Sequence, residues 1–396
     1  MKNANTKSRA SSVSKSRVSS VSKLRARLLK SWAAVSVLAA SLLFIGLLTG
    51  CTQNQPSAVD QTSAVDPADL FRTDGHGKIT GYKCAKEELP AHLVIPAKIG
   101  DEEIKEIGAW VFDGCTGLRN VTLPASLTQI DEKAFRGCTG LTSISLPANL
   151  TEIGEFAFYD CTGLTSLDLS ACTSITKIGG DAFFGCRGLT SITLPANLTK
   201  IERGAFSGCT GLTSVDLPAS LTTIGEFAFA GCTGLTSVHL PANLTTIGEA
   251  AFAGCTGLTS LTIDSANAKY KTEGNILYNK AGTTLIFAAG GLTSANIPDT
   301  VTTIGVGAFA SCTGLTSIRL PANLAQIGRG AFYGCEGLTS AVFVDKNGWA
   351  VYNDWEYKNK LADIQQNDLA DTSKAAKYLR ESTYNGGYSD KYWKKN

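Results

Sequence analysis

The chain has 396 residues, far more than one compact core needs, so two domains or one extended array of repeats is expected. Hydrophobic residues make up 43% and charged residues only 18%, which excludes disorder over most of the length. The net charge of +2 is unevenly distributed: residues 1–50 hold nine Lys and Arg and no acid, leaving 27 Lys and Arg against 34 Asp and Glu. This mildly acidic body argues against nucleic acid as a partner.

Residues 1–50 are predicted to be an export signal. A basic, Ser-rich stretch precedes an uncharged apolar run from Trp32 to Leu48, which is the order of regions in a signal peptide. The run ends in Leu48-Thr-Gly-Cys51, which resembles the lipobox of bacterial lipoproteins. That resemblance implies that Cys51 is acylated and becomes the first residue after cleavage. An uncleaved signal-anchor helix is the alternative, because about 17 apolar residues is near the minimum for a membrane span.

Residues 51–70 are predicted to be a lipidated tether. They contain Ser57-Ala-Val-Asp60 and again Ser63-Ala-Val-Asp66, without a hydrophobic period. Such a segment is expected to act as a flexible spacer. Two or more acyl chains anchor a protein stably where one does not, so a triacylated Cys51 would suffice as the membrane anchor.

Regularly spaced cysteines show that most of the chain after residue 70 consists of copies of one sequence repeat. The spacing is 23 residues from Cys115 to Cys161, from Cys186 to Cys255 and from Cys312 to Cys335. Each unit reads close to C-T-G-L-T-S-I-x-L-P-A-x-L-T-x-I-G-x-x-A-F-x-G. A period of this length carrying L-x-x-L-x-L is the leucine-rich-repeat signature. We therefore predict a β-rich leucine-rich-repeat solenoid of about ten 23-residue coils over residues 71–343.

Two intervals differ from the 23-residue period, and the repeat pattern resumes after each of them. The interval from Cys161 to Cys186 is 25 residues, and Cys172 falls where such repeats place Asn or Cys. The interval from Leu258 to Leu292 is 34 residues, and it contains two strand-like segments around the turn Lys280-Ala-Gly282. We predict a hairpin inserted at about residues 265–290.

The combination L-T-x-I-G-x-x-A-F followed by G-C-T-G-L-T-S-I-x-L-P resembles the BspA-like (treponemal-type) leucine-rich-repeat family of bacterial surface proteins. The resemblance covers about residues 71–343. It implies a solenoid of short coils, and several members of that family look like adhesins for host matrix proteins or other bacteria. It assigns no ligand residue, because ligand knowledge belongs to individual members.

Apolar residues alternate along each predicted strand, so that Leu141, Ile144 and Leu146 point inward. Gly154 is expected to allow the tight turn that follows the return strand. No repeat can bury its apolar residues alone, whereas neighbours stacked about 4.8 Å apart can. One Phe per coil should form a stacked spine: Phe112, Phe135, Phe158, Phe183, Phe206, Phe229, Phe252, Phe309 and Phe332.

Both ends of a solenoid need covering. Residues 71–108 are predicted to be a degenerate first coil with a short lead-in. Residues 344–396 are rich in Trp and Tyr and are predicted to be a small C-terminal cap. The cap should contain a helix from Lys374 to about Thr383, preceded by the capping residues Asp371-Thr-Ser373. A separate aromatic binding module is the alternative.

The cysteine ladder is expected to hold free thiols. Matching cysteines on adjacent coils have parallel Cβ vectors, which keeps the Cβ atoms too far apart for a disulfide. The thiols should pack as small apolar groups, and Cys84 lies outside the ladder. Asn149, Asn197 and Asn243 match glycosylation acceptors, but they occupy the Asn position of the repeat, so we interpret them as residues that bond the turn backbone.

One outward-facing position varies between coils, while the residue two positions before it is nearly always Ser. Both face the same side of the predicted sheet. Variation confined to one column is what a ligand surface would show, and neutral drift at a solvated position explains it equally well. The candidate ligand-facing residues are Thr122, Ser145, Asp168, Thr193, Asp216, His239, Thr262 and Arg319.

The sequence offers little material for catalysis. It has three His and lacks the G-x-S-x-G, phosphate-loop and H-E-x-x-H motifs. We expect a non-enzymatic protein without cofactor or metal, lipid-anchored at the outer membrane or cell surface. Its expected role is adhesion to a protein or glycan ligand, such as host extracellular matrix, or to other cells. The alternative is a structural envelope or periplasmic scaffold without a host ligand.

Overall fold

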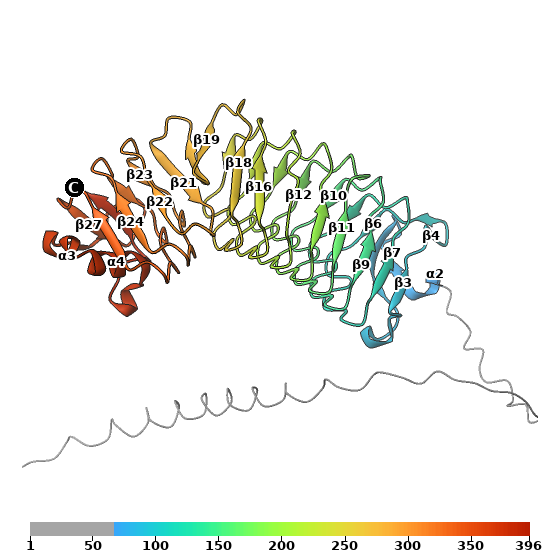
Figure 1. Ribbon diagram of the computed structural model, residues 1–396. Coiled ribbons are helices and arrows are strands. Elements are labelled where there is room, and N and C mark those ends of the chain that lie inside the picture. The colour runs from blue at the N-terminus through green and yellow to red at the C-terminus, as the bar shows by residue number, and fades with distance from the viewer. Residues whose placement is uncertain (1–66) are drawn as a thin grey trace, which may run out of the picture. The chain divides into compact units, whose positions relative to one another are not determined.

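The computed structural model describes residues 67–396 of the chain. The predicted signal peptide, Cys51 and the tether up to residue 66 lie outside these described residues. Residues 71–343 form a solenoid in which most coils contribute one front strand, one back strand and a run of turns (Figure 1). This confirms the predicted fold, because strands 23 residues apart pair in parallel, as Glu152 of one coil does with Gln129 of the coil before it.

Most front strands follow the Cys-T-G-L turn. They carry the candidate ligand-facing residues, from Thr122 to Arg319, which we call the variable column. They form four short parallel sheets, β3-β7-β9, β11-β13, β16-β18 and β22-β24-β26. Between β13 and β16, residues 213–217 make only an isolated bridge from Ser214 to Ser237. The front strands are β3 (His92–Val94), β7 (Asn120–Thr122), β9 (Ser143–Ser145), β11 (Ser166–Asp168), β13 (Ser191–Thr193), β16 (Ser237–Leu240), β18 (Ser260–Ile263), β22 (Ala295–Asn296), β24 (Ser317–Leu320) and β26 (Ser340–Phe343).

The back strands follow the Pro turn and most end in an inward Ile. Successive Ile residues pair directly, as Ile178 does with Ile201. The back strands are β6 (Glu106–Ile107), β8 (Gln129–Ile130), β10 (Glu152–Ile153), β12 (Lys177–Ile178), β14 (Lys200–Ile201), β15 (Thr223–Ile224), β17 (Thr246–Ile247), β21 (Thr284–Ala288), β23 (Thr303–Ile304) and β25 (Gln326–Ile327).

Stacked rings run through the core. The seven stacked pairs from Phe112 through Phe252 to Phe287, together with the pair Phe309–Phe332, have ring centroids 4.9–5.5 Å apart. Tyr82 extends the stack at its beginning. The sequence prediction missed Phe287, which continues the spine inside the inserted segment because its ring lies on that of Phe252.

The eleven described cysteines are free, and ten of them are buried. In seven coils the thiol also donates a hydrogen bond to the carbonyl of the spine Phe in the preceding coil, as Cys138 does to Phe112 at 3.1 Å. The thiols therefore link coils as well as fill space. Burial raises the pKa of Cys161 to about 12.

Gly154 serves a different purpose from the one predicted. Its backbone is outside the left-handed region, but an added Cβ would lie 2.7 Å from the Glu132 nitrogen of the preceding coil. The left-handed residue of this turn is instead Phe156, at φ 56°. Gly154 is needed because adjacent coils approach closely, rather than because the turn bends sharply.

The segment predicted as an inserted hairpin contains β19 (Tyr270–Glu273), β20 (Ile276–Asn279) and β21, all antiparallel. β21 then pairs in parallel with β23 and so acts as a back strand of the solenoid. β20 is buried on both faces. Leu277 belongs to the apolar cluster of the preceding coils, and Tyr278 belongs to that of the following coils.

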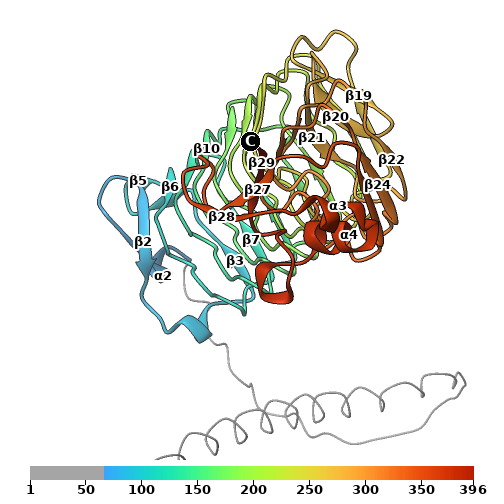
Figure 2. The same ribbon diagram turned by 90° about the vertical axis from the view of Figure 1, so that its left-hand side faces the viewer.

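Additional strands and helices cover the two ends (Figures 1 and 2). At the beginning, β1 pairs antiparallel with β2, which continues in parallel into β6. The N-terminal elements are α2 (Pro67–Leu70), β1 (Phe71–Thr73), β2 (Lys78–Tyr82), the 3-10 turn η1 (Lys86–Glu88) and the hairpin of β4 (Lys98–Ile99) and β5 (Glu102–Glu103).

At the C-terminal end, β29 pairs antiparallel with β25, and α4 packs against β26. The predicted helix is present and begins earlier than predicted, because the Asp371 carboxylate accepts hydrogen bonds from the amides of Ser373 and Lys374. It also ends earlier, at Arg380. Within residues 67–396, no helix has the length and apolar character needed to cross a bilayer. The C-terminal elements are β27 (Trp349–Tyr352), β28 (Lys360–Asp363), α3 (Gln366–Ala370), α4 (Thr372–Arg380), η2 (Thr383–Asn385) and β29 (Tyr392–Lys395).

Candidate binding surface

The variable column lies on the outward side of the front strands. Each of its eight members is exposed and directly follows a buried residue, as Asp168 follows Leu167. The alternation arises because successive side chains of a strand point to opposite faces. The members are Thr122, Ser145, Asp168, Thr193, Asp216, His239, Thr262 and Arg319.

Strand pairing brings some members together and separates others. Thr122 pairs with Ser145, Asp168 with Thr193, and His239 with Thr262. Arg319 stands apart, in the sheet β22-β24-β26 beyond the inserted strands. Seven members of the column therefore lie on the coils before the inserted strands, and Arg319 lies on a separate sheet after them.

A row of threonine hydroxyls supports the column from one side. In seven coils, the Thr immediately before the nearly constant Ser of the front strand donates its hydroxyl to the carbonyl of the matching residue in the preceding coil, as Thr165 does to Thr142 at 3.4 Å. These bonds couple neighbouring coils on this face. The donors are Thr142, Thr165, Thr190, Thr213, Thr236, Thr259 and Thr339.

The front sheet is hollowed where strand pairing lapses. Asp216, His239 and Thr262 line a hollow of about 190 Å³ together with Ser214 and Ser237. The Nδ1 atom of His239 lies 2.9 Å from the Thr262 hydroxyl oxygen, within hydrogen-bond distance. Three column residues thus meet at one small polar concavity.

Charge on the column is sparse. The amide of Ser170 donates to the Asp168 carboxylate at 2.9 Å, and this bond lowers the pKa of Asp168. Arg319 donates to the Asp299 carboxylate at 3.2 Å, so its charge is partly balanced. β11, β13, β16 and β18 carry no Lys or Arg. The surface over these coils offers hydroxyls, carboxylates and one imidazole.

The column also includes Val94 and Asn296, which the sequence prediction missed. Both pair in register with predicted members, Val94 with Thr122 and Asn296 with Arg319. A usable signal was present, because each lies two residues before a proline, as Ser145 does before Pro147. The irregular coils around them hid the match.

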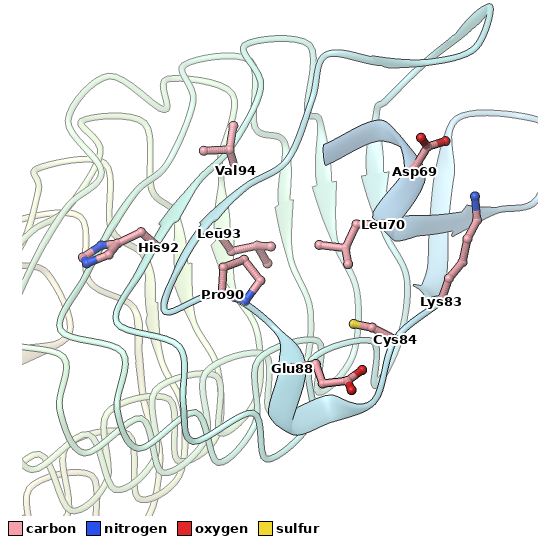
Figure 3. Close-up of a pocket in the computed structure, with 9 residues that line it drawn as sticks. All are labelled: Asp69, Leu70, Lys83, Cys84, Glu88, Pro90, His92, Leu93 and Val94. Atoms are coloured by element: carbon pink, nitrogen blue, oxygen red, sulfur yellow. The ribbon is translucent and has the colours of Figure 1, made fainter. Parts of the chain in front are cut away.

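A second concavity lies beside β3 at the beginning of the solenoid (Figure 3). It is an open pocket of about 550 Å³ whose lining is mostly apolar. Leu70 and Leu93 point toward one another across it (Figure 3). The remaining lining residues are Asp69, Lys83, Cys84, Glu88, Pro90, His92 and Val94.

Metal-ligating side chains do not gather on either surface. Over residues 67–396, no group of three or more His, Cys, Asp and Glu side chains is placed to hold a metal ion. What the front face can do is present a regular polar array to a large ligand.

These features define a leucine-rich-repeat solenoid of short coils, a fold that typically serves as a non-enzymatic scaffold for protein interactions. The model of the BspA type leucine rich repeat region matches six copies, over residues 94–175, 169–275 and 284–373, which is more than half of the chain. The chain therefore belongs to the BspA-type leucine-rich-repeat family of bacterial surface proteins. No curated protein gives a significant match.

The chain is also similar to several solved structures. A leucine-rich cell surface protein of Faecalibacterium prausnitzii is similar at 28% identity and a TM-score of 0.52, covering 69% of this chain and 74% of that one. The pneumococcal vaccine antigen PcpA shares the fold at 21% identity and a TM-score of 0.50, covering 69% and 67%. The leucine-rich repeat protein of T. pallidum is 32% identical over 49% of this chain and 90% of that one, with a TM-score of 0.44.

Proposed function

We propose that this protein is a lipid-anchored adhesin that binds a protein or glycan ligand, such as host extracellular matrix or the surface of another cell, through its front face. The observation that carries the proposal is the exposed column itself. Its chemistry changes from coil to coil while the Thr and Ser beside it stay nearly constant. A repeated backbone that presents a different side chain in each coil is suited to the recognition of a large partner.

The hollow at Asp216, His239 and Thr262 is the proposed centre of contact. Binding energy in interfaces concentrates in a few residues that occupy pockets. This hollow joins an acid, an imidazole and a hydroxyl from three successive coils. The proposed membrane attachment is the acylated Cys51, which would place the solenoid at the cell surface or outer membrane.

The test begins with a screen of the full chain against matrix proteins and glycans. Asp216, His239 and Arg319 are then replaced together by Thr, which already occupies the column at Thr193 and elsewhere. Exposed changes of this kind alter stability by under about 0.5 kcal/mol each. Affinity for the ligand found should fall about tenfold or more, because a few residues dominate an interface.

The matched control replaces Glu226, Glu249 and Arg329 by Thr, since these are exposed on the turns after the back strands. Binding should survive in this control. Loss of binding in the control but not in the column variant would show that the front face is not the site. Protease added to intact cells tests the adhesin role, because a solenoid that stays protected would be an internal envelope scaffold instead.

A further inference from the structure

A pocket lies where the last coil of the solenoid meets the C-terminal cap. It is an open concavity of about 550 Å³ between residues 333–336 of that coil and residues 380–385, which run from the end of α4 to η2. Backbone hydrogen bonds join its two walls, because the Gly330 amide donates to the Ser389 carbonyl at 2.7 Å and the Ser389 amide donates to the Glu381 carbonyl at 2.8 Å. The position of one wall relative to the other is therefore fixed by the fold.

Two residues of the last coil depart from the repeat at this pocket. Tyr333 stands directly after the spine residue, and Glu336 stands directly after the repeated Cys. Three earlier coils carry Ala and Thr at these two positions, namely Ala230, Ala253, Ala310, Thr233, Thr256 and Thr313. A residue that adapts the coil to its cap would be buried beneath the cap, whereas Tyr333 is 60% exposed and Glu336 is exposed as well. Packing against the cap therefore does not account for either residue.

The ring of Tyr333 is free to contact a ligand. Tyr159 occupies the same repeat position in an earlier coil, and its ring stacks on that of Phe184 with centroids 4.7 Å apart. Among the residues that the structure describes, no other aromatic ring or cation lies over the ring of Tyr333. A tyrosine combines an apolar ring with a polar hydroxyl, so it can hold the apolar side of a ligand next to polar groups.

Polar side chains without protein partners line the pocket beside this ring. Within residues 67–396, the side chains of Glu336, Ser382 and Asn385 form no hydrogen bond with the protein. They offer a carboxylate that accepts, a hydroxyl that donates and accepts, and an amide that does both. The pocket thus combines one exposed ring with groups suited to bonding hydroxyls.

The charged groups at the pocket balance one another. Glu381 forms ion pairs with Arg380 at 3.3 Å and with Lys377 at 3.9 Å. Arg380 also donates to the Leu338 carbonyl, which fixes its guanidinium in the wall. Together with Glu336, these residues contribute two positive and two negative charges. A site of zero net charge favours an uncharged ligand, because an ion would lose water there without gaining a counter-charge.

We propose that this pocket binds a neutral carbohydrate of about disaccharide size. A sugar ring has an apolar C–H face and a rim of hydroxyls that donate and accept, so it matches the ring of Tyr333 and the polar groups beside it. The volume lies in the range of about 300–1,000 Å³ that small-ligand sites occupy. A peptide strand is less well matched, because α4 covers the last front strand, β26, and β29 pairs with the last back strand, β25.

Binding of the full chain to a glycan array tests the proposal, in a detergent that has no sugar headgroup. The array carries neutral oligosaccharides of glucose, galactose, mannose and N-acetylglucosamine, together with sialylated and sulfated glycans. Tyr333→Ala and Glu336→Thr are the variants, because each restores the residue of earlier coils and should preserve the fold. At least one neutral oligosaccharide should bind the unmodified chain, and its affinity should fall about tenfold or more in each variant, since a few residues dominate a binding site.

Tyr159→Ala is the matched control, because it removes a tyrosine from the same repeat position in an earlier coil. It should leave the affinity unchanged, as should the joint replacement of Asp216, His239 and Arg319 by Thr, which separates this site from the front face. Failure of every neutral oligosaccharide to bind would overturn the proposal. Binding that persists undiminished in Tyr333→Ala, or that is confined to the sialylated and sulfated glycans, would also overturn it. Urea titration of each variant reports whether it remains folded.

Discussion

At the scale of single residues, two adjacent glycines differ in what surrounds them. An added Cβ at Gly179 would lie 2.7 Å from the Ile153 carbonyl oxygen of the preceding coil, whereas at Gly180 the nearest atom would be 3.7 Å away. We expect Gly179→Ala to lower the free energy of unfolding by about 1–3 kcal/mol through overpacking. Gly180→Ala should be neutral or stabilise by up to about 1 kcal/mol, because it restricts the unfolded chain.

Urea titrations of the two variants measure this difference. Neither residue has a left-handed backbone, so conformational strain does not separate them. Equal losses in both variants would show that contact between coils is not what requires a glycine at the first position.

The buried thiols predict a loss of stability in alkali. Burial raises the pKa of Cys209 to about 12, from an ordinary value of 9.0. Above pH 9 the unfolded chain loses the thiol proton while the folded chain keeps it, so the stabilisation present below pH 9 is lost as pH rises toward 12. Each such thiol should lower the free energy of unfolding by up to about 1.4 kcal/mol per pH unit.

Denaturant melts from pH 8 to 10.5 would show the slope. Cys209→Ala should reduce it by the contribution of one thiol while lowering stability at every pH. A slope identical to that of the unmodified chain would contradict the assignment of the effect to the buried ladder.

Residue roles that follow from the repeat could be predicted from the sequence, and roles that depend on the distance between coils could not. The amide of Asn149 donates to the Ala125 carbonyl at 2.9 Å, so Asn149 bonds turn backbone as interpreted, but the bonded turn belongs to the preceding coil, which the pattern did not indicate. The bond from Cys138 to Phe112 and the close contact at Gly154 join two coils. A sequence pattern does not state how closely coils approach.

At the scale of elements, the inserted strands separate two apolar cores. Leu277 and Phe287 pack with the coils before them, whereas Tyr278 and Leu285 pack with the coils after them. We expect Leu277→Ala to destabilise the preceding coils and Tyr278→Ala the following ones, each by about 2–5 kcal/mol through the cavity it leaves. The two substitutions are adjacent in sequence and serve as controls for each other.

Hydrogen exchange resolved by peptide would measure both effects. Amides of β16 and β18 should exchange faster in Leu277→Ala, and amides of β23 and β24 should exchange faster in Tyr278→Ala. Equal acceleration on both sides in both variants would show that the two cores unfold as one unit.

Elements inside the regular period were predictable because each repeat supports the same pattern independently. Phe287 was not, since the 34-residue interval from Leu258 to Leu292 removes the spacing by which a spine residue is recognised. The lapse in the front sheet at residues 213–217 was also hidden, because their sequence fits the repeat.

At the scale of the whole molecule, stability depends on neighbours. Each coil contacts chiefly the coils on either side, so the stability of the solenoid is close to a sum of contacts between neighbouring coils rather than the property of one central core. The proposed role at a cell surface requires that the chain be attached there. The predicted attachment is at Cys51, which lies outside the described residues, so it stays a prediction.

Replacing that cysteine tests the attachment. Cys51→Ala removes the thiol that would be acylated, so radioactive palmitate should no longer label the protein, and the precursor should remain uncleaved and migrate more slowly in a denaturing gel. Cys84→Ala is the matched control, because Cys84 is the described cysteine that is not buried. It should leave labelling and cleavage unchanged. Labelling that persists in Cys51→Ala would rule out this residue as the anchor, and an unlabelled, uncleaved unmodified chain held in the membrane would identify residues 32–48 as a signal anchor instead.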